Sequence, residues 1–149
     1  MFKSIIEANP IDIDAPLARV WDILIKVDQY EQWNPFTPCV ETTFAVGSPA
    51  TLHVVMNPRH KRIQYEMITA YEAERHFAWA SIMPLGLLRA NRWQVVEALD
   101  LERTRYRTYE TFEGLLVPLV MALYRADVQR GFEAVAHALK QAALRRQNE

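Results

Sequence analysis

The chain has 149 residues, half of them hydrophobic and 23% charged, which is the size and composition of a single globular domain. Its 17 Lys and Arg residues nearly balance its 18 Asp and Glu residues. The resulting net charge of -1 indicates no basic face for nucleic acid and gives no reason to expect binding to an anionic membrane. A single cysteine, Cys39, excludes an intrachain disulfide and a cysteine-rich metal site. We expect one domain over residues 1–149.

The N-terminal segment has no charged stretch followed by a long apolar run, so we expect no signal peptide. The longest mostly apolar stretch, residues 115–124, is too short to span a bilayer. Together with the single cysteine, these features predict a cytoplasmic protein without membrane insertion.

The first third of the chain predicts one strand followed by two short helices. Residues 5–13 alternate loosely between apolar and polar side chains and are typical of a strand. The segment Asp14-Ala15-Pro16 predicts a helix start with an Asp cap, and apolar residues at helical spacing extend that helix over residues 16–27. Residues 28–33 predict a second short helix that ends before Pro35.

From residue 40 the apolar pattern changes to a period of two, which predicts strands. Short turns rich in Gly, Pro, Asn and Asp separate the strands, and connections of this length join antiparallel neighbours. The six predicted strands cover residues 40–44, 50–56, 62–71, 76–82, 90–98 and 104–113.

Gly114 ends the last predicted strand, and residues 115–146 then predict one long helix. Pro118 falls in its first turn, where a missing N–H is tolerated. The predicted architecture is therefore α+β: a seven-stranded curved antiparallel sheet wrapped on the long C-terminal helix, with two short helices after the first strand. Such a shape leaves space between helix and sheet unless large side chains fill it.

Several short motifs occur in a characteristic order along the chain. They are Pro16-x-x-x-Val20-Trp21, Tyr30-x-x-Trp33-Asn34-Pro35-Phe36, Glu110-x-Phe112-x-Gly114-Leu115-Leu116-x-Pro118-Leu119, Arg130-Gly131-Phe132-Glu133-Ala134 and Ala138-Leu139-Lys140. In this order the chain resembles the START/birch-pollen-allergen superfamily, and within it the bacterial SRPBCC proteins of the polyketide cyclase/dehydrase and lipid-transport kind.

The resemblance covers nearly the whole chain and implies a helix-grip fold with a deep, mostly apolar cavity between the sheet and the long helix. Members of the family bind lipids, polyketides or other hydrophobic molecules, and some catalyse cyclisation or hydrolysis. Related sequences often carry His and an aromatic residue where this chain has Arg92 and Gln94. This departure implies a more polar cavity wall and a ligand with an acid group or a carbonyl.

Polar side chains on predicted inward strand positions are the main candidates for chemistry. If Phe112 faces the long helix, a period of two places Glu110 and Thr108 on the same face. A carboxylate buried there needs Arg92, a tyrosine or a ligand proton as partner, or else it is protonated. Glu110 is thus a candidate general acid or base, with a structural ion pair or a solvated edge carboxylate as the alternatives. Arg92 is a candidate to hold a carboxylate or enolate, and otherwise it faces solvent or pairs with Glu110.

The segment around Asn34 predicts either the cavity mouth or a plain Pro-bounded turn with Asn34 capping backbone groups. Aromatic residues on the strands predict either cavity walls or core. The full set of candidate ligand-binding residues is Trp33, Asn34, Phe36, Tyr65, Met67, Phe77, Trp79, Arg92, Gln94, Thr108, Glu110, Phe112, Val120 and Tyr124.

The four histidines have no metal-ligand spacing, and no phosphate-binding or dinucleotide-binding motif occurs, so we expect neither a metal nor a cofactor. Three functions remain open: a binding protein for a hydrophobic small molecule, an enzyme of the polyketide cyclase or aromatase kind, and a protein-interaction or stress-response module with a filled interior. We expect a monomer or a homodimer that does not bind nucleic acid.

Overall fold

The computed structural model of the chain describes residues 1–147. Along the chain the elements are β1 (Phe2–Glu7), β2 (Ile11–Ile13), α1 (Leu17–Ile25), the 3-10 helix η1 (Val27–Gln32), β3 (Cys39–Thr42), β4 (Pro49–Asn57), β5 (His60–Glu72), β6 (His76–Met83), β7 (Leu88–Asp100), β8 (Arg103–Gly114) and α2 (Val117–Gln147). No helix among the described residues combines the length and the hydropathy needed to cross a bilayer.

The strands form one antiparallel sheet in the order β1-β8-β7-β6-β5-β4-β3, and β2 also pairs with β8. The sheet therefore has eight strands rather than the predicted seven, because the first predicted strand is broken between Glu7 and Ile11. Pro10 lies in this break and has no N–H to donate to the sheet. Glu7 pairs with Tyr109 and Ile11 with Tyr106, so the break inserts one extra residue against β8.

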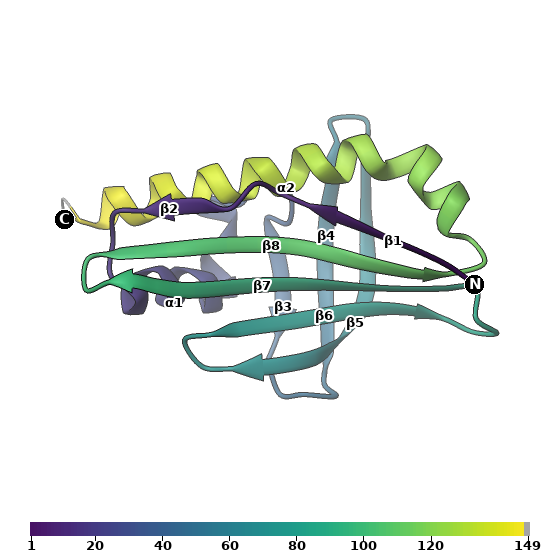
Figure 1. Cartoon of the computed structure of the whole chain (residues 1–149), viewed down its shortest axis with the longest axis horizontal. Helices are drawn as coiled ribbons and strands as arrows, with labels where there is room; N and C mark the ends of the chain where they lie inside the picture. The colour runs from purple at the N-terminus through teal and green to yellow at the C-terminus, as the bar shows by residue number, and fades with distance from the viewer. Residues whose placement is uncertain (148–149) are drawn as a thin grey trace.

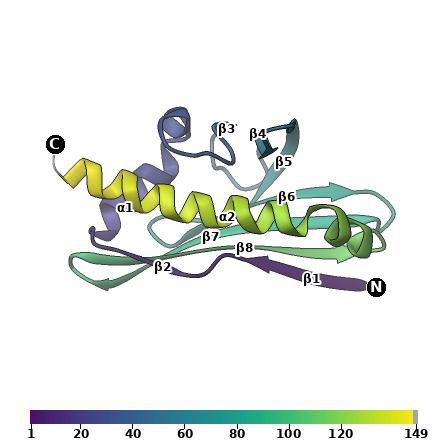
Figure 2. The ribbon, with the colours of Figure 1, turned by 90° about the horizontal axis from the view of Figure 1, so that it is seen from above.

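The long helix α2 lies along the concave side of the sheet, with α1 beside its C-terminal half (Figures 1 and 2). Its buried side chains recur at a spacing of three or four, as expected for one helical face. They pack on inward residues of the sheet to form the core, and include Val128, Phe132, Val135, Leu139 and Ala143. The predicted long helix and the helix-grip fold are confirmed.

The short helices fill one end of the space under the sheet. The backbone N–H groups of Arg19 and Val20 bond to the carbonyl of Pro16, which makes Pro16 the capping residue of α1. No side chain of the described residues caps this end of the helix, so the predicted Asp14 cap is wrong. The second predicted helix is present as η1, a tighter 3-10 helix.

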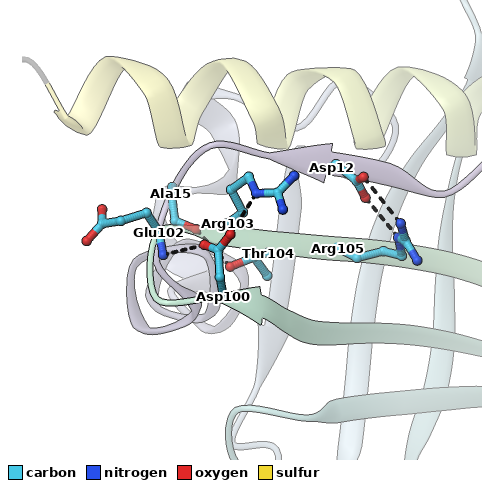
Figure 3. Close-up of polar contacts among 7 residues, drawn as sticks. All are labelled: Asp12, Ala15, Asp100, Glu102, Arg103, Thr104 and Arg105. Carbon is cyan, nitrogen blue, oxygen red and sulfur yellow. Dashed lines mark hydrogen bonds and ion pairs between the residues drawn. The ribbon is translucent and has the colours of Figure 1, made fainter.

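The outer face of β8 carries a row of arginines that point to solvent. Arg103 donates to Asp100 at 2.9 Å, and Arg105 bonds Asp12 on β2 with its Nε 2.8 Å from Oδ1 (Figure 3). Thr104, between them, points to the opposite face and donates to the carbonyl of Ala15 at 2.8 Å. This alternation fixes the register of β8, so that Thr108, Glu110 and Phe112 fall on the inner side of the sheet.

Candidate ligand-binding cavity

A partly open cavity of about 170 Å³ lies between the sheet and the first half of α2. Liquid water would fill this volume with about five or six molecules, which is also the space of a one- or two-ring organic compound. Its apolar walls come from the inner face of the sheet and from α2. They include Leu52, Val54, Trp79, Leu88 and Phe112 on the strands and Val120, Tyr124, Val128 and Phe132 on the helix.

Polar side chains from the inner face of β5 reach into this cavity as a connected row. Arg62, Gln64 and Glu66 are two residues apart and therefore share one face of the strand. With its amide oxygen toward Arg62, Gln64 accepts from Nε and Nη2 of Arg62 at 2.7 Å and donates to Oε2 of Glu66 at 2.5 Å. The second oxygen of Glu66, Oε1, is buried without a partner among residues 1–147.

The hydrophobic pattern predicts that two other residues of β5 face the cavity, but this polar row occupies the inner face of the strand instead. Tyr65 is 78% exposed and Met67 is 38% exposed, so both lie on the outer face of β5. The assignment was wrong because it took the more apolar side of the strand as the inner one. Counting back from Ile68, which is buried, would have placed Glu66, Gln64 and Arg62 inside instead.

Arg92, on the inner face of β7, is held from three sides. Its Nε donates to Oγ1 of Thr108 at 3.2 Å, and its guanidinium carbon lies 4.3 Å from the ring centre of Phe132 and 5.8 Å from that of Phe36. Such cation–π contacts fix the plane of the guanidinium. Its Nη2 is buried without a partner in the described chain, and Arg92 lines the cavity. The two N–H groups of Nη2 are therefore left for a ligand.

Two carboxyl groups share the cavity with Arg92. Burial raises the pKa of Glu66 to about 8, and the charge of Glu110 adds to this effect while Arg92 and Arg62 oppose it. Burial raises the pKa of Glu110 to about 7, again opposed by Arg92 and Arg62. Glu110 keeps some accessible surface and presents it to the cavity. Near neutral pH these groups can both donate and accept protons.

The segment after η1 contributes to the cavity through its neighbours. Oδ1 of Asn34 accepts from the backbone N–H groups of Phe36 at 3.1 Å and Thr37 at 2.9 Å. Asn34 thus caps backbone in a turn, one of the two predicted roles, and holds Phe36 and Thr37 against the cavity. Trp33 packs edge-on against Tyr30, with ring centres 5.1 Å apart, and does not line the cavity.

Three further candidates lie on inward positions beyond the cavity. Phe77 is a core residue, packed against Trp21 and Trp79. Gln94 accepts from the hydroxyl of Tyr106 at 2.7 Å, and Thr108 bonds Arg92. The strands are longer than the cavity, so an inward position alone does not make a lining residue. The candidates that do line it are Phe36, Trp79, Arg92, Glu110, Phe112, Val120 and Tyr124.

Comparison with known families gives one match over nearly the whole chain. The model of the family described as polyketide cyclase/dehydrase and lipid transport matches residues 8–144. No curated protein is matched.

Residues 1–147 contain no group of three or more His, Cys, Asp or Glu side chains arranged to hold a metal ion.

Solved structures with the same fold cover the chain almost completely. The Zhui aromatase/cyclase from a Streptomyces species superposes with a TM-score of 0.80 at 20% identity, covering 98% of this chain and 96% of that one. A START superfamily protein from Mycobacterium smegmatis gives 0.72 at 14% identity, with 95% and 97% covered. A protein from Arthrobacter aurescens gives 0.66 at 25% identity, with 89% and 84% covered.

Proposed function

We propose that this chain, which belongs to the polyketide cyclase/dehydrase and lipid transport family, binds a small molecule with an apolar body and an oxygen-bearing head in the cavity under α2. One observation carries the proposal: three buried polar atoms without partners among residues 1–147 belong to residues that line this single cavity. They are Nη2 of Arg92, Oε1 of Glu66 and Oγ1 of Thr37.

Unpaired polar groups of this kind are costly, at about 1–3 kcal/mol for each buried group left without a partner. A ligand that supplies hydrogen bonds at these atoms recovers that cost. Arg92 donates to a carbonyl, carboxylate or enolate oxygen, and a protonated Glu66 donates to a second oxygen. The rings of Phe36, Trp79 and Phe112 then cover the apolar body of the ligand.

A pair of probes that differ only in the head group tests this arrangement. We expect 1-naphthoate to bind and to change the fluorescence of Trp79, and naphthalene to bind more weakly. The variant Arg92→Met is expected to weaken naphthoate binding by about tenfold or more while naphthalene binding changes little. Native mass spectrometry of freshly purified protein is expected to show a co-purifying molecule. Absence of binding by both probes, with a clean apo mass, contradicts the proposal.

A second candidate function, acid–base catalysis on the bound molecule, is favoured by the two carboxyl groups. Burial raises the pKa of both groups, and the charge of Glu110 raises that of Glu66 further, so one carboxyl can be ionised while the other keeps its proton near neutral pH. In this role Glu110 takes a proton from a carbon next to a ligand carbonyl, Arg92 stabilises the enolate oxygen, and Glu66 gives that oxygen its proton. The fold shared with the Streptomyces aromatase/cyclase is compatible with this chemistry.

Proton exchange separates catalysis from binding alone. In deuterated buffer, wild-type protein is expected to accelerate deuterium incorporation into the methyl group of 2-acetylnaphthalene. The variant Glu110→Gln is expected to abolish the acceleration while still binding 1-naphthoate. If wild-type protein gives no acceleration, the binding function stands without the catalytic one.

A further inference from the structure

Large apolar side chains are exposed together at one end of the molecule. Leu85 is 90% exposed at the β6–β7 turn, and Leu115 is 58% exposed between β8 and α2. Four more exposed residues come from the start of β1 and the end of β6. We call this set the apolar end surface; it comprises Met1, Phe2, Ile82, Met83, Leu85 and Leu115.

Backbone contacts bring these distant segments together. Phe2 pairs with Gly114, and the N–H of Leu115 donates to the carbonyl of Gly86 at 3.1 Å. Met1, Ile82 and Met83 line one shallow depression together with Gly86. Figure 1 shows the N-terminus, the β6–β7 turn and the start of α2 at the same end of the molecule, opposite the C-terminus.

The charges around this end differ from those at the opposite end. Exposed Lys3 and Arg89 flank the apolar end surface, and Glu113 pairs across the sheet with both of them. The turns at the other ends of these strands, after β5 and β7, hold four carboxylates, Glu72, Glu74, Asp100 and Glu102, against two arginines, Arg75 and Arg103, which pair with Glu72 and Asp100. Two cations against one carboxylate therefore lie beside the apolar side chains, an excess that the net charge of the chain does not show.

We propose that the apolar end surface docks onto the surface of a phospholipid bilayer. Leu85 and Leu115 are aliphatic and project from a turn and from the residues that precede α2, and the other four side chains lie at or next to strand ends. Exposed apolar side chains of this kind suit shallow insertion among lipid headgroups and acyl chains. Protein interfaces are instead enriched in Tyr, Trp and Arg at their centres and need a complementary shape. Lys3 and Arg89 add attraction to anionic headgroups.

The cavity lies directly behind this surface. Leu88 lines both the cavity and the depression formed by Met1, Ile82 and Met83. If the cavity binds an apolar ligand, as proposed above, docking lets that ligand pass between bilayer and cavity with little exposure to water. Only this last step rests on the proposed function, because docking itself needs no ligand.

Sedimentation with lipid vesicles tests the proposal. Ligand-free protein is expected to bind vesicles of phosphatidylcholine and phosphatidylglycerol, and to bind pure phosphatidylcholine vesicles more weakly. The variants Leu85→Ser and Leu115→Ser are each expected to weaken binding by about tenfold, the effect of removing one large aliphatic side chain from the apolar phase. Arg89→Ser is expected to weaken binding to the anionic vesicles alone.

A matched control is available at the other end of the molecule. Leu101 is also 90% exposed in a hairpin turn, between β7 and β8, so Leu101→Ser is expected to leave vesicle binding unchanged. Circular dichroism checks that each variant is folded.

Three results would overturn docking: no vesicle binding by wild-type protein, an equal loss with Leu101→Ser, or self-association of wild-type protein that Leu85→Ser abolishes. The variant Arg92→Met, which tests the cavity, is expected to keep full vesicle binding. Failure of ligand binding and failure of docking are thus seen in different variants.

Discussion

The buried carboxyl of Glu66 makes the stability of the fold depend on pH in an unusual direction. A carboxyl group with an ordinary pKa of 4.5 is ionised in the unfolded chain at neutral pH, whereas burial holds the pKa of Glu66 at about 8 in the folded chain. The folded protein therefore binds more protons than the unfolded chain between these two values. The bound proton makes its full contribution to the free energy of unfolding at low pH, and this contribution is lost as the pH rises toward 8.

The substitution Glu66→Gln tests this reasoning, because the amide keeps the shape of a protonated carboxyl and cannot ionise. Each pH unit in the window costs the wild-type fold about 1.4 kcal/mol, so Glu66 alone predicts a loss of roughly 3 kcal/mol between about pH 6 and pH 8. Glu110 is expected to add a smaller loss that ends near its own pKa of about 7. In the variant Glu66→Gln, only the loss in the free energy of unfolding that Glu110 causes should remain.

Urea unfolding at a series of pH values measures the effect as the free energy of unfolding. Glu102→Gln, an exposed turn residue, is the matched control and should follow the wild-type profile. Parallel profiles for wild type and Glu66→Gln would refute the reasoning, since they would mean that Glu66 ionises as easily in the folded chain as in the unfolded one.

Two further predictions concern packing around the cavity and the anchoring of β8. In Gly131→Ala the new Cβ would lie 2.5 Å from Cε1 and 2.9 Å from Cγ of Phe36. We expect the free energy of unfolding to fall by about 1 kcal/mol, because overpacking outweighs the gain in helix propensity. The affinity for 1-naphthoate, measured in a fluorescence titration, is also expected to change. Unchanged affinity with raised stability would show that the Phe36 ring moves aside freely. Thr104→Val leaves the Ala15 carbonyl without its 2.8 Å hydrogen bond and is expected to lower the free energy of unfolding by about 1–2 kcal/mol, with wild-type stability as the contradicting result.

Most of the fold could be predicted from hydrophobic periodicity and turn residues. The long helix, predicted over residues 115–146, begins at Val117 because the N–H groups of Leu115 and Leu116 bond back to Gly86 and Leu87. The first strand was predicted as continuous because a loose alternation passes through Pro10. Its interruption depends on pairing with β8, which is distant in sequence.

The inner face of a strand could be predicted only where its apolar side is also its inner side. This holds for β8, where Phe112 and Glu110 both line the cavity. It fails for β5, where Tyr65 faces solvent and the inner side carries Gln64 and Glu66. A hydrophobic pattern reports which residues avoid water, and a cavity wall departs from that rule wherever polar side chains face inward.

The sharing of one cavity by Glu66 and Glu110 could not be predicted at all, because it depends on the curvature of the sheet. Strands β6 and β7 lie between β5 and β8. In a flat sheet, three strand spacings of about 4.8 Å would separate the two carboxyl groups widely. The charge of Glu110 nevertheless raises the pKa of Glu66, and both residues line one cavity. The bend of the sheet around α2 therefore does more than enclose a volume: it brings together, beside Arg92, two carboxyl groups that no local sequence pattern relates.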